Sequence, residues 1–304
     1  MLANTKALLN KAQRGHYALP HFNINNLEII QGVVQAAINT RSPIILATSE
    51  GAIEYAGIQF LHSIAKTASE LASIPIALHL DHGKDIKIIK QAIDLGYSSV
   101  MIDASHQEFE KNIALTKQVV NLAHKKGISV EAELGTIGGV EDKVKSRNIL
   151  YTDPSKAAEF VKRTGCDFLA VAIGTSHGAY KFAGIAKLRI DLLKQITKIV
   201  KVPLVLHGAS GVPQEIVSQA QRYGAKLEGV EGVPDTQIKA AIKAGICKIN
   251  TDTDLRIAFD AAVRKVIKEQ PKDFDPRHLL SPARDLITQV AEHRIKLFGS
   301  NNRC

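Results

Sequence analysis

Three histidines of this chain stand beside a glycine, shortly after apolar runs that are typical of strands. They are His82 in HLDHG, His177 in GTSHG and His207 in LHGASG. Histidine is the commonest metal ligand, and glycine lets a bound ligand approach the backbone closely. Any one of them alone is more often a loop histidine than a ligand. Together they predict a catalytic zinc site, in which three protein ligands leave coordination positions for substrate.

An acid/base group accompanies the first of these histidines. In the run that precedes His82, the alternation puts Ala77, His79 and Asp81 on one face of a strand. Asp81 is the last of them and would lie at the rim, next to the metal. We therefore predict that Asp81 transfers a proton.

Three further carboxylates lie near the ends of predicted strands. Glu131 and Glu133 share one face of a strand, and Asp103 directly follows another. Buried carboxylates are costly unless they are paired or bound to metal. One interpretation is a hydrogen-bonded polar layer in the core. The other, which we predict, gives Asp103 and Glu133 a second metal position and Glu131 a supporting role.

Two segments have the features of a phosphate site. HGASG (207–211) precedes a predicted helix at Pro213, and NTDT (250–253) precedes the helix that carries Arg256. Backbone N–H groups at a helix start bind phosphate, and the loops after strands seven and eight are the usual phosphate site of barrels. Lys181 could add positive charge. Ser49 could contact a second phosphate or simply cap a helix.

The elements that must bring these residues together alternate along the chain. Eight short apolar runs are separated by longer helical patterns, and several helices end in a glycine typical of a left-handed C-cap. Such alternation implies parallel strands with right-handed crossovers, and eight units favour a closed α/β barrel, the (β/α)8 TIM barrel. In a closed barrel all strand ends meet on one rim. The alternative is an open doubly wound sheet, which is weakened because no GxGxxG follows the first strand.

The predicted elements are as follows. The strands are 17–22, 43–48, 74–80, 98–102, 128–133, 167–173, 202–207 and 245–249, and the helices are 26–40, 54–72, 84–95, 106–126, 154–164, 188–200, 213–222, 235–244, 252–269 and 282–298.

No domain boundary is visible in the 304 residues, so we predict one barrel domain over residues 1–304. The polar segment 135–153 is too long for a minimal loop and is predicted to be a lid. A helical extension over about 270–304 is predicted to wrap the barrel or form an interface.

Composition excludes several classes of protein. The net charge of +9 is scattered, and no nucleic-acid-binding motif accompanies it, so an anionic substrate is the better interpretation. No apolar stretch approaches the length of a membrane span. Three dispersed cysteines, Cys166, Cys247 and Cys304, exclude a fully paired disulfide framework and fit a reducing cytoplasm.

Taken in order, five motifs resemble one family. HLDHG, EAELG…GGVED, GTSHG, LHGASG and NTDTDLR are similar to those of class II, metal-dependent fructose-1,6-bisphosphate aldolases of the shorter bacterial type. The resemblance runs over nearly the whole chain. It implies a (β/α)8 barrel that cleaves fructose 1,6-bisphosphate to dihydroxyacetone phosphate and glyceraldehyde 3-phosphate. It also implies a homodimer or homotetramer and a monovalent cation, Na⁺ or K⁺, held by backbone carbonyls.

The resemblance assigns roles residue by residue. Asp81 resembles the proton donor and acceptor at the C4 oxygen, and Glu141 the loop acid that moves a proton on the dihydroxyacetone phosphate carbon. The histidines named above resemble the zinc ligands, and Asp103 and Glu133 the second-metal positions. Ser49 resembles a contact to the aldehyde half. Residues that resemble other substrate contacts are Asn23, Gly178, Lys181, Gly208, Ala209, Ser210, Asn250, Thr251, Asp252 and Thr253.

Four alternatives remain open. Tagatose-1,6-bisphosphate aldolases share the motif set, and only the NTDTDLR form with Arg256 favours fructose. Lys248, in the last predicted strand, could instead form a Schiff base, although a lysine that faces the barrel interior is the simpler interpretation. A zinc hydrolase would usually carry HExxH or HxH, which the chain lacks. A non-enzymatic surface-adhesion barrel would leave all five motifs unexplained.

Overall fold

The structure is a computed structural model that describes residues 1–141, 144–146, 150–177 and 187–304. Side chains are described for all of these except residues 138–141, 144–146 and 177.

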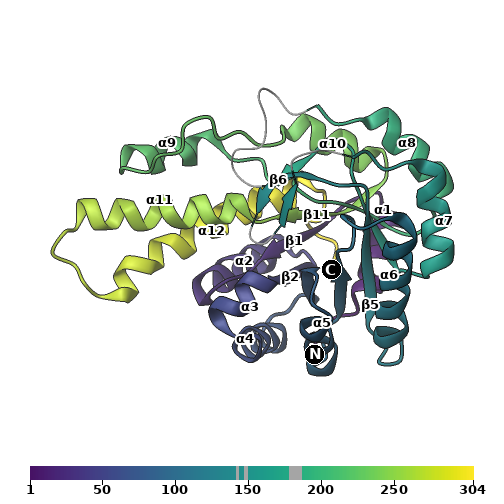
Figure 1. Ribbon diagram of the computed structural model, residues 1–304. Coiled ribbons are helices and arrows are strands. Elements are labelled where there is room, and N and C mark those ends of the chain that lie inside the picture. The colour runs from purple at the N-terminus through teal and green to yellow at the C-terminus, as the bar shows by residue number, and fades with distance from the viewer. Residues whose placement is uncertain (142–143, 147–149, 178–186) are drawn as a thin grey trace.

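Within these residues, eight parallel strands form a closed barrel, which confirms the predicted fold class (Figure 1). Every predicted strand overlaps an observed one. The strands are β1 (Leu19–Asn23), β2 (Ile44–Ser49), β3 (Ile76–Gly83), β4 (Ser99–Ile102), β5 (Ser129–Leu134), β8 (Phe168–Val171), β10 (Leu204–Leu206) and β11 (Ile246–Thr251). Their order around the barrel is β1-β11-β10-β8-β5-β4-β3-β2, so each strand neighbours the next one along the chain and β11 closes on β1.

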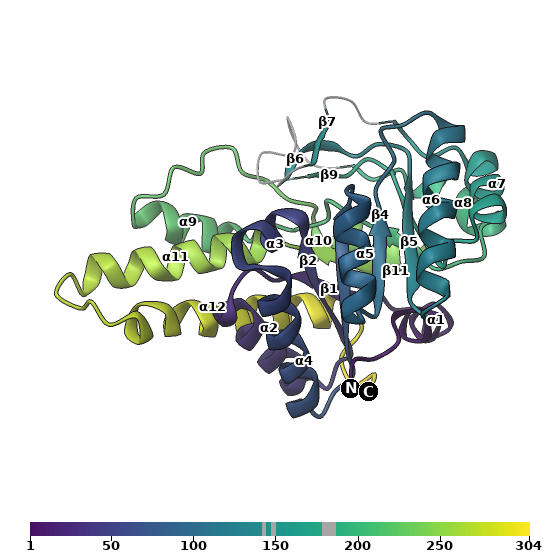
Figure 2. The same ribbon diagram turned by 60° about the horizontal axis from the view of Figure 1, so that its bottom comes forward.

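Helices surround the barrel strands (Figures 1 and 2). They are α1 (Thr5–Gly15), α2 (Leu27–Thr40), α3 (Glu50–Ala56), α4 (Ile58–Leu71), α5 (Ile86–Leu95), α6 (Phe109–His124), α7 (Pro154–Thr164), α8 (Ile190–Ile199) and α10 (Asp235–Lys243). The first of them, α1, packs through Leu9 and Ala12 against the apolar cluster inside the barrel. The ends of the helices have local causes. Asn26, Asp85 and Asp153 accept backbone N–H groups as N-caps, and Gly96 and Gly165 end helices in the left-handed conformation as expected.

Two predicted helices were wrong in their boundaries. The helix predicted over 54–72 is two helices, because Gly57 adopts φ +82° between α3 and α4. The helix predicted to begin at residue 282 begins six residues earlier, as α12 (Pro276–Leu297). There Asp275 caps the first turn and Pro276 needs no hydrogen bond, so the helix starts early and tolerates Pro282 inside it.

The C-terminal part of the chain forms an arm that extends away from the barrel. It consists of α9 (Gln214–Arg222), α11 (Thr253–Glu269) and α12. Figures 1 and 2 show α11 and α12 side by side as a hairpin, with α9 next to α11 and the second half of α12 returning along α2. The arm thus joins the eighth barrel unit to the first. No helix among the described residues is long and apolar enough to cross a membrane.

A small sheet lies beyond the carboxyl ends of β5 and β8 (Figure 2). It consists of β6 (Gly138–Glu141), β7 (Val144–Ser146) and β9 (Ser176–His177) in the order β7-β6-β9. The segment 135–153, predicted as a lid, therefore contains two antiparallel strands. Its strand β6 pairs with β9, with Gly139 opposite His177.

Candidate active site

The carboxyl end of β3 supplies two consecutive side chains to the same site. Successive residues of a strand normally face opposite sides. His82, however, has φ +47°, and the pairing of β3 with β4 shifts register between Leu80 and Gly83. A Cβ at Gly83 would lie 2.6 Å from the Met101 carbonyl oxygen, so this turn needs glycine. A left-handed residue costs about 1–3 kcal/mol and persists where the surroundings enforce it.

Two of the predicted zinc ligands converge, and a carboxylate holds each of them. Asp103 Oδ2 accepts a hydrogen bond from His82 Nδ1 at 2.9 Å. On the other ring, His207 Nε2 lies 2.6 Å from Glu131 Oε1. The remaining nitrogens, His82 Nε2 and His207 Nδ1, face each other at 2.7 Å. A carboxylate behind a histidine fixes its ring and its tautomer, which is the common arrangement around a bound metal.

Lys248 completes this arrangement from the barrel interior. It is fully buried, and its Nζ lies 2.8 Å from Glu131 Oε2. Glu131 therefore connects Lys248 to His207. Lys248 faces the barrel interior below the two histidines. Because Glu131 holds its amine there, Lys248 is poorly placed to attack a substrate carbonyl and form a Schiff base.

Carboxylates give the site strong negative charge. Burial and the nearby charge of Asp103 raise the pKa of Glu133 to about 8. Its Oε2 has no hydrogen-bond partner among the described residues and lies 3.9 Å from His207 Nδ1. Burial alone would lower the pKa of His82, but Asp81 and Asp103 raise it to about 10. The site therefore attracts positive charge, as a proton or as a metal ion.

The donor set fits a divalent metal ion. Asp81, His82 and His207 each offer a donor atom, and these atoms lie within 4.8 Å of one another. His82, Asp103 and Glu133 form a second group of the same kind. Imidazole and carboxylate are the ligands of catalytic zinc. The two groups share His82, and the first contains two of the three predicted zinc ligands.

Asp81 has a different environment from the other carboxylates. It is 4% exposed, and amides flank it on both sides. Asn23 Nδ2 donates to one oxygen at 2.9 Å, and Asn250 Nδ2 donates to the other at 3.1 Å. The amides come from β1 and β11, so the closure of the barrel orients the carboxylate at the rim.

The two predicted phosphate segments lie next to each other. Gly208 adopts φ +61°, and a Cβ there would lie 2.7 Å from the Ser176 carbonyl oxygen. Ser210 Oγ accepts the Asp252 N–H at 3.3 Å, which joins the loop after β10 to the start of α11. Ala209 is buried beside them. Small residues and backbone N–H groups are thus gathered at the first turn of α11, as a phosphate site requires.

The sequence interpretation missed the residues that fix this loop. Asp254 is fully buried and accepts the N–H groups of Gly211 at 3.2 Å and Val212 at 2.7 Å. Arg294 of α12, 1% exposed, donates to the same carboxylate at 2.7 Å. The only signal in the sequence was an acidic residue inside NTDTDLR. Its partner lies 40 residues away.

Two more supporting residues were missed. Glu50 accepts the N–H groups of Lys84 and Asp85 at 2.7 Å each and so fixes the turn after His82. Ser105 donates to Asp103 at 2.8 Å. Glu50 does not stand out in the sequence, because the turn that it fixes lies 34 residues away, whereas Ser105 lies only two residues after Asp103.

The remaining predicted residues fall into two sets. Ser49 caps α3 through the Ala52 N–H at 3.2 Å, and Arg256 pairs with Asp252 at 2.7 Å. Ser49 is the last residue of β2, and Arg256 lies in the first turns of α11, which follows β11. Thr251, at the end of β11, and Thr253, at the start of α11, are buried. Outside the described residues are Gly178, Lys181 and the side chains of Glu141 and His177.

Comparison with known proteins agrees with this geometry. A sequence model of the family described as Fructose-bisphosphate aldolase class-II matches residues 3–303. A fructose-bisphosphate aldolase of Giardia intestinalis is 47% identical over 98% of this chain and 93% of that protein. The corresponding protein of Thermus caldophilus is 47% identical over 100% of both chains. The crystal structure of the YdjI aldolase from Escherichia coli K12 has a TM-score of 0.81 at 37% identity, and covers 100% of this chain and 99% of that chain. The chain therefore belongs to the class II fructose-bisphosphate aldolase family.

Proposed function

We propose that this protein reversibly cleaves fructose 1,6-bisphosphate to dihydroxyacetone phosphate and glyceraldehyde 3-phosphate, with zinc as its catalytic metal. The observation that carries the proposal is the convergence of His82 Nε2 and His207 Nδ1 at 2.7 Å, next to a carboxylate that amides hold in place. His177, on β9, is proposed as the third ligand. Bound there, zinc would act as a Lewis acid toward the ketose oxygens.

The residues of the chain divide the proton transfers between them. Asp81 faces the same point as the two histidines and is proposed to take the proton of the C4 hydroxyl as the C3–C4 bond breaks. Asn23 and Asn250 keep its carboxylate oriented. Glu141, on β6, is proposed to deliver a proton to the carbon of the dihydroxyacetone phosphate half. In the direction of synthesis both transfers reverse.

Backbone N–H groups and polar or positively charged side chains would hold the two phosphates of the substrate. The segments 208–210 and 250–253, with Gly178, are proposed to bind the phosphate of the dihydroxyacetone half. Ser49, Lys181 and Arg256 are proposed for the other half. Arg256 is held by Asp252 at the rim, and this pair is proposed to favour fructose over its C4 epimer tagatose.

The test is a coupled cleavage assay on the purified protein. Fructose and tagatose 1,6-bisphosphates are supplied in parallel, before EDTA, after EDTA and after zinc is restored. We expect metal-dependent cleavage with a preference for fructose. A preference for tagatose would overturn the substrate, and cleavage that resists EDTA would overturn the metal mechanism. His207→Ala should lower the bound zinc per chain, and His106→Ala, on the surface, serves as its control.

Three finer properties belong to the same proposal. Asp103 and Glu133 would hold a second divalent ion with His82. Backbone carbonyls would hold Na⁺ or K⁺. The three cysteines are free, and two of them are buried, which supports work in a reducing compartment such as the cytoplasm.

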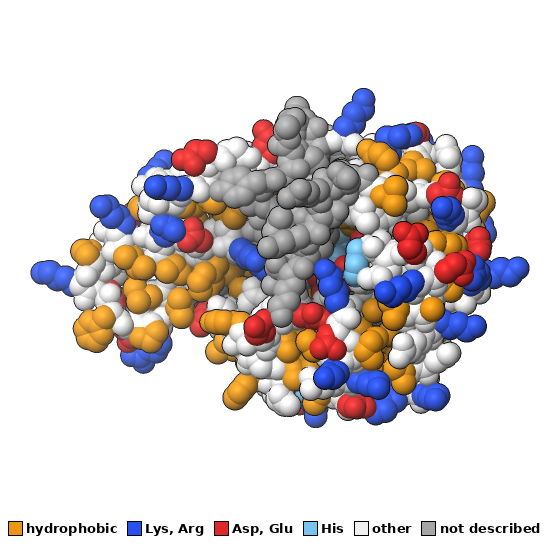
Figure 3. Space-filling view, viewed as in Figure 1, with side chains coloured by type: hydrophobic (Ala, Val, Ile, Leu, Met, Phe, Trp, Pro, Cys, Tyr) orange, Lys and Arg blue, Asp and Glu red, His pale blue; other side chains and the backbone are white. Residues whose placement is uncertain are grey.

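The arm is proposed as the contact between subunits of a dimer or tetramer. Figure 3 shows apolar side chains gathered over α11 and α12. Ile267 is 55% exposed there, and Phe274, between the two helices, is 90% exposed. Large apolar side chains so exposed commonly mark an interface.

A further inference from the structure

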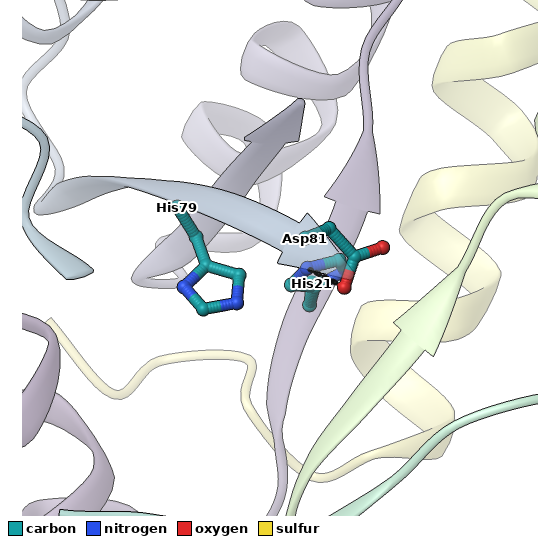
Figure 4. A group of neighbouring side chains, drawn as sticks. All are labelled: His21, His79 and Asp81. Atoms are coloured by element: carbon teal, nitrogen blue, oxygen red, sulfur yellow. Dashed lines mark ion pairs between the residues drawn. The ribbon is translucent and has the colours of Figure 1, made fainter. Parts of the chain in front are cut away.

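Two histidines inside the barrel have no part in the reaction proposed above. His21 on β1 and His79 on β3 are both fully buried, and their rings meet edge to face with centroids 5.5 Å apart (Figure 4). Among the described residues, neither ring nitrogen of His21 has a hydrogen-bond partner, and neither has Nε2 of His79. Each such buried group costs about 1–3 kcal/mol if nothing pairs with it. A ligand that paired with all three nitrogens would remove this cost.

The free nitrogens face a common point. His21, His79 and Asp81 each offer a donor atom, and these three atoms lie within 4.8 Å of one another. His21 Nε2 is 3.6 Å from Asp81 Oδ1, too far for a hydrogen bond and close to the separation of two ligands on one ion. Ser99 Oγ lies 2.7 Å from Nδ1 of His79, so Nε2 of that ring is the nitrogen available to the cluster, and it lies 3.5 Å from Glu131 Oε2. Figure 4 shows Asp81 and His21 adjacent, with His79 alongside.

The charges around the cluster are compatible with a cation. Burial, followed by the positive charge of Lys248, holds the pKa of both imidazoles well below the usual range. Both rings are therefore neutral, the form that coordinates metals. The Lys248 charge is itself matched by Glu131 at 2.8 Å. Asp81 adds a carboxylate, so the donor set is two imidazoles and one carboxylate.

We propose that His21, His79 and Asp81 form an inhibitory site for zinc, separate from the position shared by His82, Asp103 and Glu133 and beneath the catalytic metal position. Two neutral nitrogens and one carboxylate oxygen suit zinc and similar first-row ions. An ion in this site takes the Asp81 carboxylate, which is then no longer able to accept the substrate proton. Inhibition therefore rests on the proposed function, whereas the binding of the ion does not.

Entry to the site should be slow. Both imidazoles lie beneath the rim, and Asp81 is already hydrogen-bonded to Asn23 and Asn250. At least one amide must release the carboxylate before an ion can bind. Excess zinc should consequently inhibit with a lag, while the catalytic metal is already in place.

The test compares the wild type with His21→Leu. Removing a ring whose nitrogens are unpaired should leave the fold and the activity at low zinc unchanged. A chromophoric chelator that competes for zinc counts the bound equivalents, and we expect the variant to bind one equivalent fewer. The zinc concentration that halves the activity should rise about tenfold or more, since even an indirect metal partner is worth 10–100-fold in affinity. Equal stoichiometry and equal inhibition in both proteins would overturn the site.

The controls separate this proposal from the proposed function. His278→Gln removes an exposed histidine that also pairs with a carboxylate, Asp273 at 3.0 Å, and should behave as the wild type. If His278→Gln relieves zinc inhibition as strongly as His21→Leu does, zinc binding at the surface explains the inhibition and the proposed site is wrong. If His21→Leu does not fold, His21→Gln is used, because its amide fills the space and is a poor zinc ligand. If neither protein cleaves either sugar, but His21→Leu still binds one zinc equivalent fewer than the wild type, the result supports the inhibitory site and contradicts only the proposed aldolase function.

Discussion

Asp81 shows how a few neighbours give one carboxylate a distinct task. Asp103 and Glu131 each hold a histidine of the site, while Asp81 is held by two amides and faces the same point as the metal ligands. We expect Asp81→Ala to lower kcat/KM by about 10²–10⁴, the usual contribution of a general base. Zinc at the catalytic position should stay bound, since its histidines keep their own carboxylates. Steady-state kinetics and metal analysis of the same preparation check this, and an unchanged kcat would contradict the role.

The cysteines provide a second test at the scale of residues. Burial raises the pKa of Cys166 to about 12 and that of Cys247 to about 11, whereas Cys304 is exposed. A protonated, buried thiol reacts poorly. At pH 8 a disulfide reagent should therefore modify one thiol per folded chain and three after denaturation. Cys304→Ser should remove the fast reaction altogether; if fast labelling persists, one of the two buried thiols is accessible.

At the scale of elements, α12 acts on the site although it lies outside the barrel. Its Arg294 neutralises Asp254, which in turn holds the backbone of residues 211 and 212. Removing one partner of a buried ion pair leaves a lone charge and costs about 3–5 kcal/mol. We expect Arg294→Met to lower the free energy of unfolding by that amount and to raise the KM for the sugar bisphosphate. Urea unfolding and kinetics measure the two effects.

The double variant Arg294→Met with Asp254→Asn is the control for this pair. With both charges gone, no lone charge is buried, so part of the lost stability should return. The KM should stay high, because a neutral amide is a weaker acceptor for the loop N–H groups. If the single variant loses less than about 1 kcal/mol, as a surface pair would, the ion pair does not support the loop.

At the scale of the whole molecule, the arm is the feature that a barrel by itself does not need. Its exposed apolar residues led us to propose a contact between subunits. Phe274→Asp places a charge at the most exposed of them and should shift the assembly toward smaller species in analytical ultracentrifugation. Phe60→Asp, at a residue 73% exposed on α4, is the matched control and should leave the mass unchanged. Equal masses for all three proteins would exclude Phe274 from the interface.

Local patterns in the sequence were sufficient to predict the barrel. Alternation and apolar runs located each strand within a few residues, and glycines such as Gly96 and Gly165 ended helices where expected. These features depend on near neighbours in the chain, so a single sequence contains them. The two errors in helix boundaries have local causes. Gly57, with its positive φ, separates α3 from α4, and the Asp275 cap sets the start of α12. The motifs likewise predicted the family, which the comparison with known proteins confirmed.

Only the tertiary structure decided which partners those motif residues have. The nitrogens of His82 and His207 face each other across 125 positions of the chain, and Glu131 reaches Lys248 across 117. Which ring nitrogen is free, and which carboxylate holds it, depends on the register of strands around a closed barrel. The interior cluster of His21, His79 and Asp81 is a consequence of the same closure. The sequence thus determined the elements and the chemical groups, because short-range sterics and periodicity set them, whereas barrel closure alone determined their distances.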